Sequence, residues 1–266
     1  MGGFALVIQP DEEEPEAAEV LVDGSVGGRR YRFLLDTGAA KSAILSDDYT
    51  ATFAAVGQHT SSGVFAGGSE DVVIAPTIEV GPIVQRDFPV TRLAQNIPQR
   101  RNLIGMDMLK DYRCHFLFDE HRVEIDGDDL PGVTFYDLAL DSRFHPYVPV
   151  RFGAVTASAV WDTGAGITVV DMGLVARHPA LFQPAGQSQG TDATGATVAT
   201  PMFTMLGATV GNLELPPLRV AGVDLSGVNT TIETPMDLIL GYNMLCRANW
   251  LMDFPRRRWA MAKRLS

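Results

Sequence analysis

Two aspartates stand in the same short motif at two places in the chain. Residues 34–40 read Leu-Leu-Asp-Thr-Gly-Ala-Ala, and residues 160–166 read Val-Trp-Asp-Thr-Gly-Ala-Gly. Each aspartate, Asp36 or Asp162, ends an apolar run of β type and precedes a turn through which glycine lets the backbone bend. One copy alone is typical of ordinary turn chemistry, because Asp, Thr and Gly all favour turns. Two carboxyl groups held together at the ends of buried strands could act as an acid and a base.

The surroundings of the two motifs also repeat. Leu103-Ile104-Gly105 follows the first motif and Ile239-Leu240-Gly241 follows the second, and the next four residues match as Met-Asp-Met-Leu against Tyr-Asn-Met-Leu. A pattern that recurs over half a chain indicates an internal duplication.

The repeat divides the chain into three parts. Residues 1–19 are expected to hold an N-terminal edge strand and a solvated acidic linker. Residues 20–131 form the first half, and residues 132–266 form the second half.

This doubled pattern resembles the aspartic peptidases, in particular the retropepsin-like branch, over nearly the whole chain from Val20 onward. Retroviral members build their site from two identical chains, whereas pepsin-like members carry both halves in one. Here both halves lie in one chain and each is short. The resemblance implies an all-β fold with few short helices, in which two pseudo-symmetric retropepsin-like β-barrel halves meet at the active site. It also implies a monomer.

The resemblance further implies an aspartic endopeptidase with Asp36 and Asp162 as its catalytic pair. Two adjacent carboxylates cannot both ionise cheaply, so the pair holds one proton between them. The ionised member would take a proton from a bound water, while the protonated member hydrogen-bonds the scissile carbonyl. The resulting chemistry needs no covalent intermediate, no metal and no cofactor.

Four residues next to the aspartates have expected supporting roles. Gly38 and Gly164 let each turn approach the pair closely, and backbone amides there can donate to the carboxylates. The resemblance implies that Thr37 and Thr163 interlock across the interface by hydrogen bonds, although packing alone is the competing role for these threonines.

The expected substrate is a peptide or protein bound as an extended segment. Glycine-rich residues 57–71 and 185–200 lie where family members carry mobile hairpins over the substrate, and ordinary β-turn loops remain the competing interpretation. The first segment lacks the tyrosine of pepsin-like flaps, which favours the retropepsin comparison. The residues expected to contact substrate are Val64, Phe65, Ala66, Thr194 and Gly195 in these segments, with Ile104 and Leu240 as walls of hydrophobic pockets near the cut.

Composition bounds the other classes of function. The chain has 266 residues, 46% of them hydrophobic, which is enough to bury one or two cores. A formal net charge of −11 disfavours nucleic acid as a partner. The apolar residues 4–8 are too short to span a membrane, and the five histidines form no metal-binding motif. Two cysteines indicate no disulfide framework. We therefore expect a cytoplasmic protein, or a periplasmic or secreted one if a leader has been removed.

Two other functions compete with the peptidase. A catalytically silent peptide-binding module of the same fold would keep the groove, but it has no need of both acids. A glycosidase also uses two carboxyl groups, but it does not require Thr-Gly after each acid in a duplicated half-chain. Mutation of either aspartate separates the enzymes from the binding module, and peptide against glycan substrates separates the two enzymes.

The residues after the two motifs predict a mildly acidic pH optimum. Pepsin-like enzymes carry a hydroxyl residue there that supports the ionised carboxylate, whereas this chain has Ala39 and Ala165. Without that stabilisation of the anion, the pair should ionise at higher pH than in gastric enzymes. A pH–rate profile checks this expectation, and a maximum near pH 2–3 would contradict it.

Overall fold

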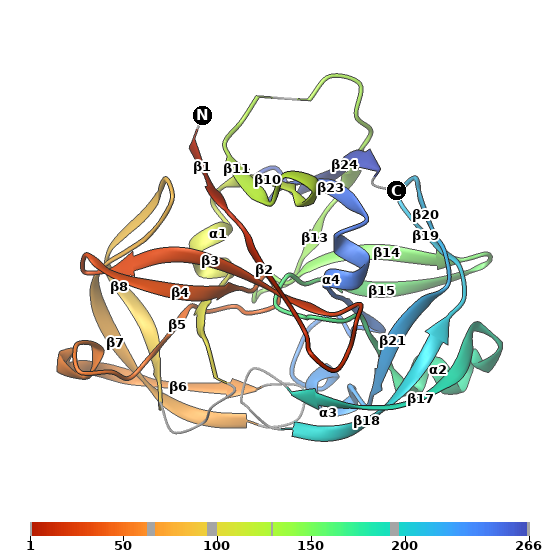
Figure 1. Ribbon diagram of the computed structural model, residues 1–266, viewed down its shortest axis with the longest axis horizontal. Helices are drawn as coiled ribbons and strands as arrows, with labels where there is room; N and C mark the ends of the chain where they lie inside the picture. Colours follow the sequence, from red (N-terminus) through yellow and green to blue (C-terminus); the bar gives the residue numbers. More distant parts are fainter. Residues whose placement is uncertain (1, 63–66, 95–99, 129, 192–196, 265–266) are drawn as a thin grey trace.

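The fold is built almost entirely from β-strands, as the computed structural model in Figure 1 shows. The structure describes residues 2–62, 67–94, 100–128, 130–191 and 197–264. Three sheets contain the strands, and the helices are short. The predicted all-β class is confirmed.

The first sheet belongs to the N-terminal half of the chain. Its eight strands lie in the order β2-β3-β4-β9-β5-β8-β7-β6. The strands are β2 (Val7–Pro10), β3 (Ala18–Val26), β4 (Arg29–Leu35), β5 (Ala43–Leu45), β6 (Ala55–Ser62), β7 (Gly67–Val80), β8 (Ile83–Leu93) and β9 (Asn102–Ile104). Strand β9 lies between β4 and β5 and runs parallel to β4, so the chain that leaves β4 at Asp36 must turn away before it returns as β5.

The second sheet repeats this plan in the C-terminal half. Its path is β17-β18-β21-β16-β22-β15-β14-β19-β20, with β13 paired to β14. The strands are β13 (Ala139–Leu140), β14 (Pro146–Phe152), β15 (Val155–Trp161), β16 (Val169–Asp171), β17 (Phe182–Thr191), β18 (Thr197–Met205), β19 (Ala208–Val210), β20 (Leu213–Leu215), β21 (Leu218–Val223) and β22 (Leu238–Leu240). Here β22 lies between β15 and β16 and runs parallel to β15.

A third sheet of six strands joins the two halves. Its order is β1-β11-β10-β23-β24-β12, from β1 (Gly2–Ala5), β10 (Arg113–Leu117), β11 (Arg122–Ile125), β12 (Phe135–Asp137), β23 (Ala248–Asp253) and β24 (Arg258–Arg264). The central pair is β10 with β23, one strand from each half, in which Phe116 stands opposite Trp250. Strand β1 lies at one edge of this sheet, and β2, which follows it in the chain, lies at one edge of the first sheet.

Short helices connect these sheets. They are α1 (Met106–Leu109), α2 (Met172–Arg177), α3 (Ser226–Asn229) and α4 (Tyr242–Leu245), together with 3₁₀ turns η1 (Thr50–Thr52), η2 (Phe118–Glu120) and η3 (Pro179–Leu181). Helix α1 follows β9, and α4 follows β22. Within the described ranges, no helix is long and apolar enough to cross a bilayer.

An aromatic cluster fills the core beneath the six-stranded sheet. The ring of Trp161 lies 4.7 Å from that of Phe116 and 6.0 Å from that of Trp250, and Trp259 lies 5.8 Å from Trp250. All four side chains are fully buried. Because Trp161 directly precedes Asp162, this cluster anchors one aspartate loop to the sheet that joins the halves.

The acidic segment 11–19 differs from the solvated linker that its composition predicts. Glu14 is 7% exposed, and the Nε–H of Arg219 on β21 donates to its carboxylate at 2.6 Å. The Asp11 carboxylate accepts the backbone N–H of Glu14 at 2.8 Å and so forms the turn that presents it. A cross-half ion pair therefore fixes one acid, a partner that composition cannot reveal.

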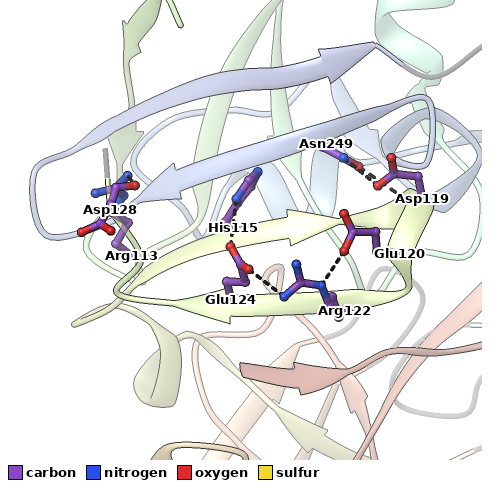
Figure 2. A network of polar contacts seen from close by, with 8 residues as sticks. All are labelled: Arg113, His115, Asp119, Glu120, Arg122, Glu124, Asp128 and Asn249. Carbon is purple, nitrogen blue, oxygen red and sulfur yellow. Dashed lines mark hydrogen bonds and ion pairs between the residues drawn. The ribbon is translucent and has the colours of Figure 1, made fainter. Parts of the chain in front are cut away.

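Polar side chains also tie the halves together at the six-stranded sheet, as Figure 2 shows. The amide of Asn249 on β23 donates to the Asp119 carboxylate at 2.7 Å. On β10 and β11, Glu124 accepts from Arg122 at 2.6 Å and lies 3.5 Å from the imidazole of His115. The two halves therefore share backbone pairing, an aromatic core and polar contacts at this sheet.

Candidate active site

Each aspartate is held at the end of its strand by a backbone hydrogen bond. The N–H of Asp36 donates to the carbonyl of Ile104 at 2.9 Å, and the N–H of Asp162 donates to the carbonyl of Leu240 at 3.1 Å. These bonds continue the parallel pairings of β4 with β9 and of β15 with β22. The same backbone arrangement therefore supports both aspartates.

The two threonines of the motifs interlock. The N–H of Thr37 donates to Oγ1 of Thr163 at 3.2 Å, and the N–H of Thr163 donates to Oγ1 of Thr37 at 3.1 Å. Each hydroxyl in turn donates to a carbonyl of the other half, that of Trp161 at 2.8 Å and that of Leu35 at 2.6 Å. Both threonines are fully buried, so these four hydrogen bonds form out of water.

The interlock brings the two carboxyl groups into contact. A hydrogen bond joins Asp36 to Asp162, and the amides of Gly38 and Gly164 both donate to Oδ1 of Asp162, at 3.1 and 2.8 Å. A Cβ atom on Gly164 would lie 2.4 Å from the Asp36 carboxyl carbon, and one on Gly38 would lie 2.4 Å from Asp162 Oδ2. Glycine is therefore required at both positions for the carboxyl groups to lie this close.

Burial and mutual contact change the acidity of the pair. Burial, the neighbouring Asp162 charge and the hydrogen bond with Asp162 raise the pKa of Asp36 well above its usual range, although the backbone amides of Gly38 and Ala39 lower it. Burial also raises the pKa of Asp162, but the amides of Gly164 and Gly38 oppose this rise by donating to its carboxylate. The arrangement therefore favours a proton on Asp36 and a charge on Asp162.

A second pair of contacts beneath the loops was not anticipated from the sequence. The backbone N–H and hydroxyl of Ser42 donate to Oδ1 of Asp107 at 2.9 and 2.7 Å. In the other half, the backbone N–H and hydroxyl of Thr168 donate to Oδ1 of Asn243, both at 2.8 Å. The alignment of Gly-Met-Asp with Gly-Tyr-Asn carried this signal, because Asp and Asn share an acceptor oxygen.

These two supports differ at one atom. The amide of Asn243 also donates to the carbonyl of Arg219 at 2.8 Å. Oδ2 of Asp107 is buried and has no hydrogen-bond partner among the described residues. Burial raises the pKa of Asp107 even though hydrogen bonds from Ser42 lower it. The first half thus carries a poorly solvated acid where the second half carries a neutral amide.

The structure corrects the prediction that Ile104 and Leu240 line substrate pockets. Both side chains are 0% exposed and belong to the main core, and they contribute to the site through their carbonyls. Successive side chains of a strand face opposite ways. The preceding residues, Leu103 and Ile239, therefore face away from the main core. Each of these packs in a small separate apolar cluster.

Both glycine-rich segments form hairpins, whose tips lie outside the described residues. Strand β6 pairs with β7, and β17 pairs with β18, both as antiparallel hairpins. Figure 1 shows them on the side of the molecule opposite the six-stranded sheet. The predicted contact residues Val64, Phe65, Ala66, Thr194 and Gly195 all fall outside the described ranges.

Two adjacent carboxyl groups can together supply an acid and a base. Within the part of the chain that the structure describes, no group of three or more His, Cys, Asp or Glu side chains could hold a metal ion. Where the two Asp-Thr-Gly loops meet, the carboxyl groups of Asp36 and Asp162 are in direct contact.

The chain is rich in β-strands and brings two Asp-Thr-Gly loops into contact. Residues 22–111, about a third of the chain, match the family model of gag-polyprotein putative aspartyl proteases. This match contains the first Asp-Thr-Gly loop and α1. It supports the aspartic peptidase superfamily and a general aspartic protease function. No curated protein matches the chain.

The close approach at Gly164 predicts a large effect of one methyl group. Gly164→Ala would place a Cβ atom 2.4 Å from the Asp36 carboxyl carbon, so the loops must separate. We expect a loss of about 1–3 kcal/mol in the free energy of unfolding, measured with denaturant. Gly227→Ala in α3 is the matched control, because its new Cβ meets nothing within 4 Å. A stability within about 0.5 kcal/mol of the parent for Gly164→Ala would contradict the geometry.

Oδ2 of Asp107 is buried without a hydrogen-bond partner among the described residues, so we predict that Asp107→Asn stabilises the protein at neutral pH. Burial raises the pKa of Asp107 in the folded state. Asp107 therefore contributes fully to the free energy of unfolding while it is protonated, below the unfolded pKa of about 3.9, and this contribution is lost as the pH rises through the folded pKa. We expect Asp107→Asn to gain on the order of 1 kcal/mol at pH 7 and nothing near pH 3. Thermal unfolding at both pH values tests this, with the exposed Asp111→Asn as control. A gain of equal size at both pH values would argue against it.

Proposed function

We propose that this protein is an aspartic endopeptidase that hydrolyses peptide bonds with a water molecule activated between Asp36 and Asp162. One observation carries the proposal: the carboxyl groups of Asp36 and Asp162 share a hydrogen bond at the meeting point of two interlocked Asp-Thr-Gly loops. Such a pair supplies an acid and a base at one place, which peptide hydrolysis by water requires.

The contacts of the pair suggest how the roles divide. Asp162, which accepts two backbone N–H groups, is the ionised member and takes a proton from the attacking water. Asp36 is the protonated member and donates its proton to the oxygen of the scissile carbonyl. Attack gives a tetrahedral diol, with Asp162 now protonated and Asp36 ionised. As the diol collapses, Asp162 gives its proton to the leaving nitrogen and Asp36 takes a proton back from a diol hydroxyl, which restores the starting state of the pair.

We further propose that the chain is a fused pair of retropepsin-like halves that acts as a monomer. Corresponding features occur in both halves: the parallel strand pairs, the Ser42–Asp107 and Thr168–Asn243 contacts, and the helices α1 and α4. The family match covers the first half, so the evidence for the second half is this internal correspondence.

An extended peptide with hydrophobic residues near the cut is the substrate that the surroundings favour. Leu34 and Leu103 share a small apolar cluster, as do Val160 and Ile239 in the second half. Leu34 and Val160 each precede a catalytic aspartate by two residues, so they lie on the face to which the carboxyl groups turn. The two hairpins would cover the peptide and pair with its backbone.

The proposal is tested by hydrolysis of an unbiased peptide mixture between pH 3 and pH 8, read by mass spectrometry. Asp36→Asn and Asp162→Asn should each reduce cleavage by about 10²–10⁴-fold or more, because each removes one half of an acid–base pair. Asp111→Asn, an exposed carboxylate outside the site, is the matched control and should cleave normally.

Two outcomes would overturn the proposal. Residual cleavage at the parental rate in either aspartate variant would show that the pair is not the catalytic site. Failure of well-folded parent protein to cleave any peptide at any pH would favour the silent peptide-binding module instead.

A further inference from the structure

A buried histidine and aspartate form a compact turn immediately before β14. Nδ1 of His145 lies 2.7 Å from Oδ2 of Asp141, and the backbone N–H groups of His145 and Arg143 both donate to Oδ1 of Asp141 at 2.9 Å. The side chain of Asp141 is 1% exposed and that of His145 is 10% exposed. The turn passes through Phe144 at a φ of 65°, a left-handed conformation that costs energy for a residue with a side chain. The fold tolerates strain here and fixes the imidazole in one orientation.

The strand register brings this imidazole to the catalytic pair. Strands β14 and β15 are antiparallel, with Tyr147 opposite Val160. Continuing the same register by two residues on each strand sets His145 opposite Asp162. Residues opposite one another in an antiparallel pair point to the same face. The observed pairing ends at Tyr147 and Val160, and its extension places His145 next to Asp162, on which His145 acts electrostatically.

The first half has a different residue at the corresponding place. Strands β3 and β4 pair Leu21 with Leu34, so the same extension sets Glu19 opposite Asp36. The side chain of Glu19 is 33% exposed and lies 3.4 Å from Nε of Arg101. A buried histidine thus flanks Asp162, whereas a partly exposed acid flanks Asp36. The two carboxyl groups share a common backbone arrangement but have unlike neighbours.

Charges around the histidine determine what it can do. Asp141 contacts His145 in its own turn, Asp162 directly follows the paired strand β15, and Asp36 is hydrogen-bonded to Asp162. Arg143 and Glu233 lie on the side of Tyr147, whose hydroxyl donates to the carbonyl of Thr234 at 2.7 Å. Burial raises the pKa of Asp162, while the Gly164 and Gly38 amides, the hydrogen bond with Asp36 and the electrostatic interaction with His145 lower it. The histidine therefore acts on Asp162 in the same direction as the two amides.

We propose that His145, oriented by Asp141, is a positioning residue that keeps Asp162 the ionised member of the catalytic pair and so keeps the shared proton on Asp36. This inference rests on the proposed peptidase function. Two carboxyl groups in equivalent surroundings would hold the shared proton equally often. A neighbour beside only one of them therefore decides which aspartate is protonated. His145 acts through Asp162 and does not itself touch the reacting atoms.

The pH dependence of kcat/KM tests this role. In His145→Gln, the acidic limb of the profile should move to higher pH by about half to one pH unit, the size expected for loss of one charge several ångströms away. Asp141→Asn, which keeps the shape but releases the imidazole, should move the limb in the same direction. KM near the optimum should change little. His178→Gln, at the end of α2, is the matched control and should leave the profile unchanged. A uniform loss of kcat at all pH values, with the limb unmoved, would show a merely structural role and overturn the proposal.

A readout without turnover separates this inference from the proposed function. The carboxyl carbons of the aspartates can be titrated by ¹³C NMR in the parent protein and in His145→Gln. We expect the resonance of Asp162, identified by its loss in Asp162→Asn, to titrate at higher pH in His145→Gln. If the parent protein cleaves no peptide but this shift occurs, the proposed function fails and the coupling stands. If cleavage occurs and the resonance does not shift, the coupling fails and the peptidase stands. His145→Lys, which restores a positive charge, should reverse the shift if His145→Gln folds poorly.

Discussion

The reciprocal hydrogen bonds between Thr37 and Thr163 are the constraint on which the rest of the structure depends. Each threonine donates its hydroxyl to the opposite half and accepts an amide from it, wholly out of water. Separating the loops would leave four buried donors and their acceptors unpaired, at about 1–3 kcal/mol for each unsatisfied group. The two aspartates can therefore meet in only one arrangement, the one in which both halves are folded and correctly docked.

That arrangement is unfavourable by itself, because it places two carboxyl groups in contact where Asp36 is buried and Asp162 is only partly exposed. The molecule offsets the cost at a distance from the pair. The six-stranded sheet shares its central strands between the halves, and Trp161 joins the loop of Asp162 to an aromatic core of Phe116, Trp250 and Trp259. The apolar burial of this core holds the loops together against the repulsion of the acids.

Equivalent backbones do not make equivalent acids. Asp36 and Asp162 each follow an equivalent strand, begin an equivalent turn and donate their N–H to an equivalent carbonyl. The amides of Gly38 and Gly164, however, both donate to Oδ1 of Asp162. Beneath the loops, Asp107 stands where the other half has Asn243, and beside them Glu19 stands where the other half has His145. A shared proton needs such differences, because a fully symmetric pair would have no preferred acid and no preferred base.

The sequence by itself determined the fold class, the catalytic candidates and the threonine partners. The doubled Asp-Thr-Gly motif and the later apolar-apolar-Gly motifs are local patterns whose chemistry is readable from residue type. The direction in which a side chain points, by contrast, depends on how its strand pairs with other strands. Leu103 and Ile104 are both apolar, and only the pairing of β9 decides that Ile104 enters the main core. The burial of Glu14 depends on Arg219, about two hundred residues later, and the nearness of His145 to Asp162 depends on the register of β14 with β15. Composition and spacing carry no information on such long-range contacts, so only the tertiary structure decided them.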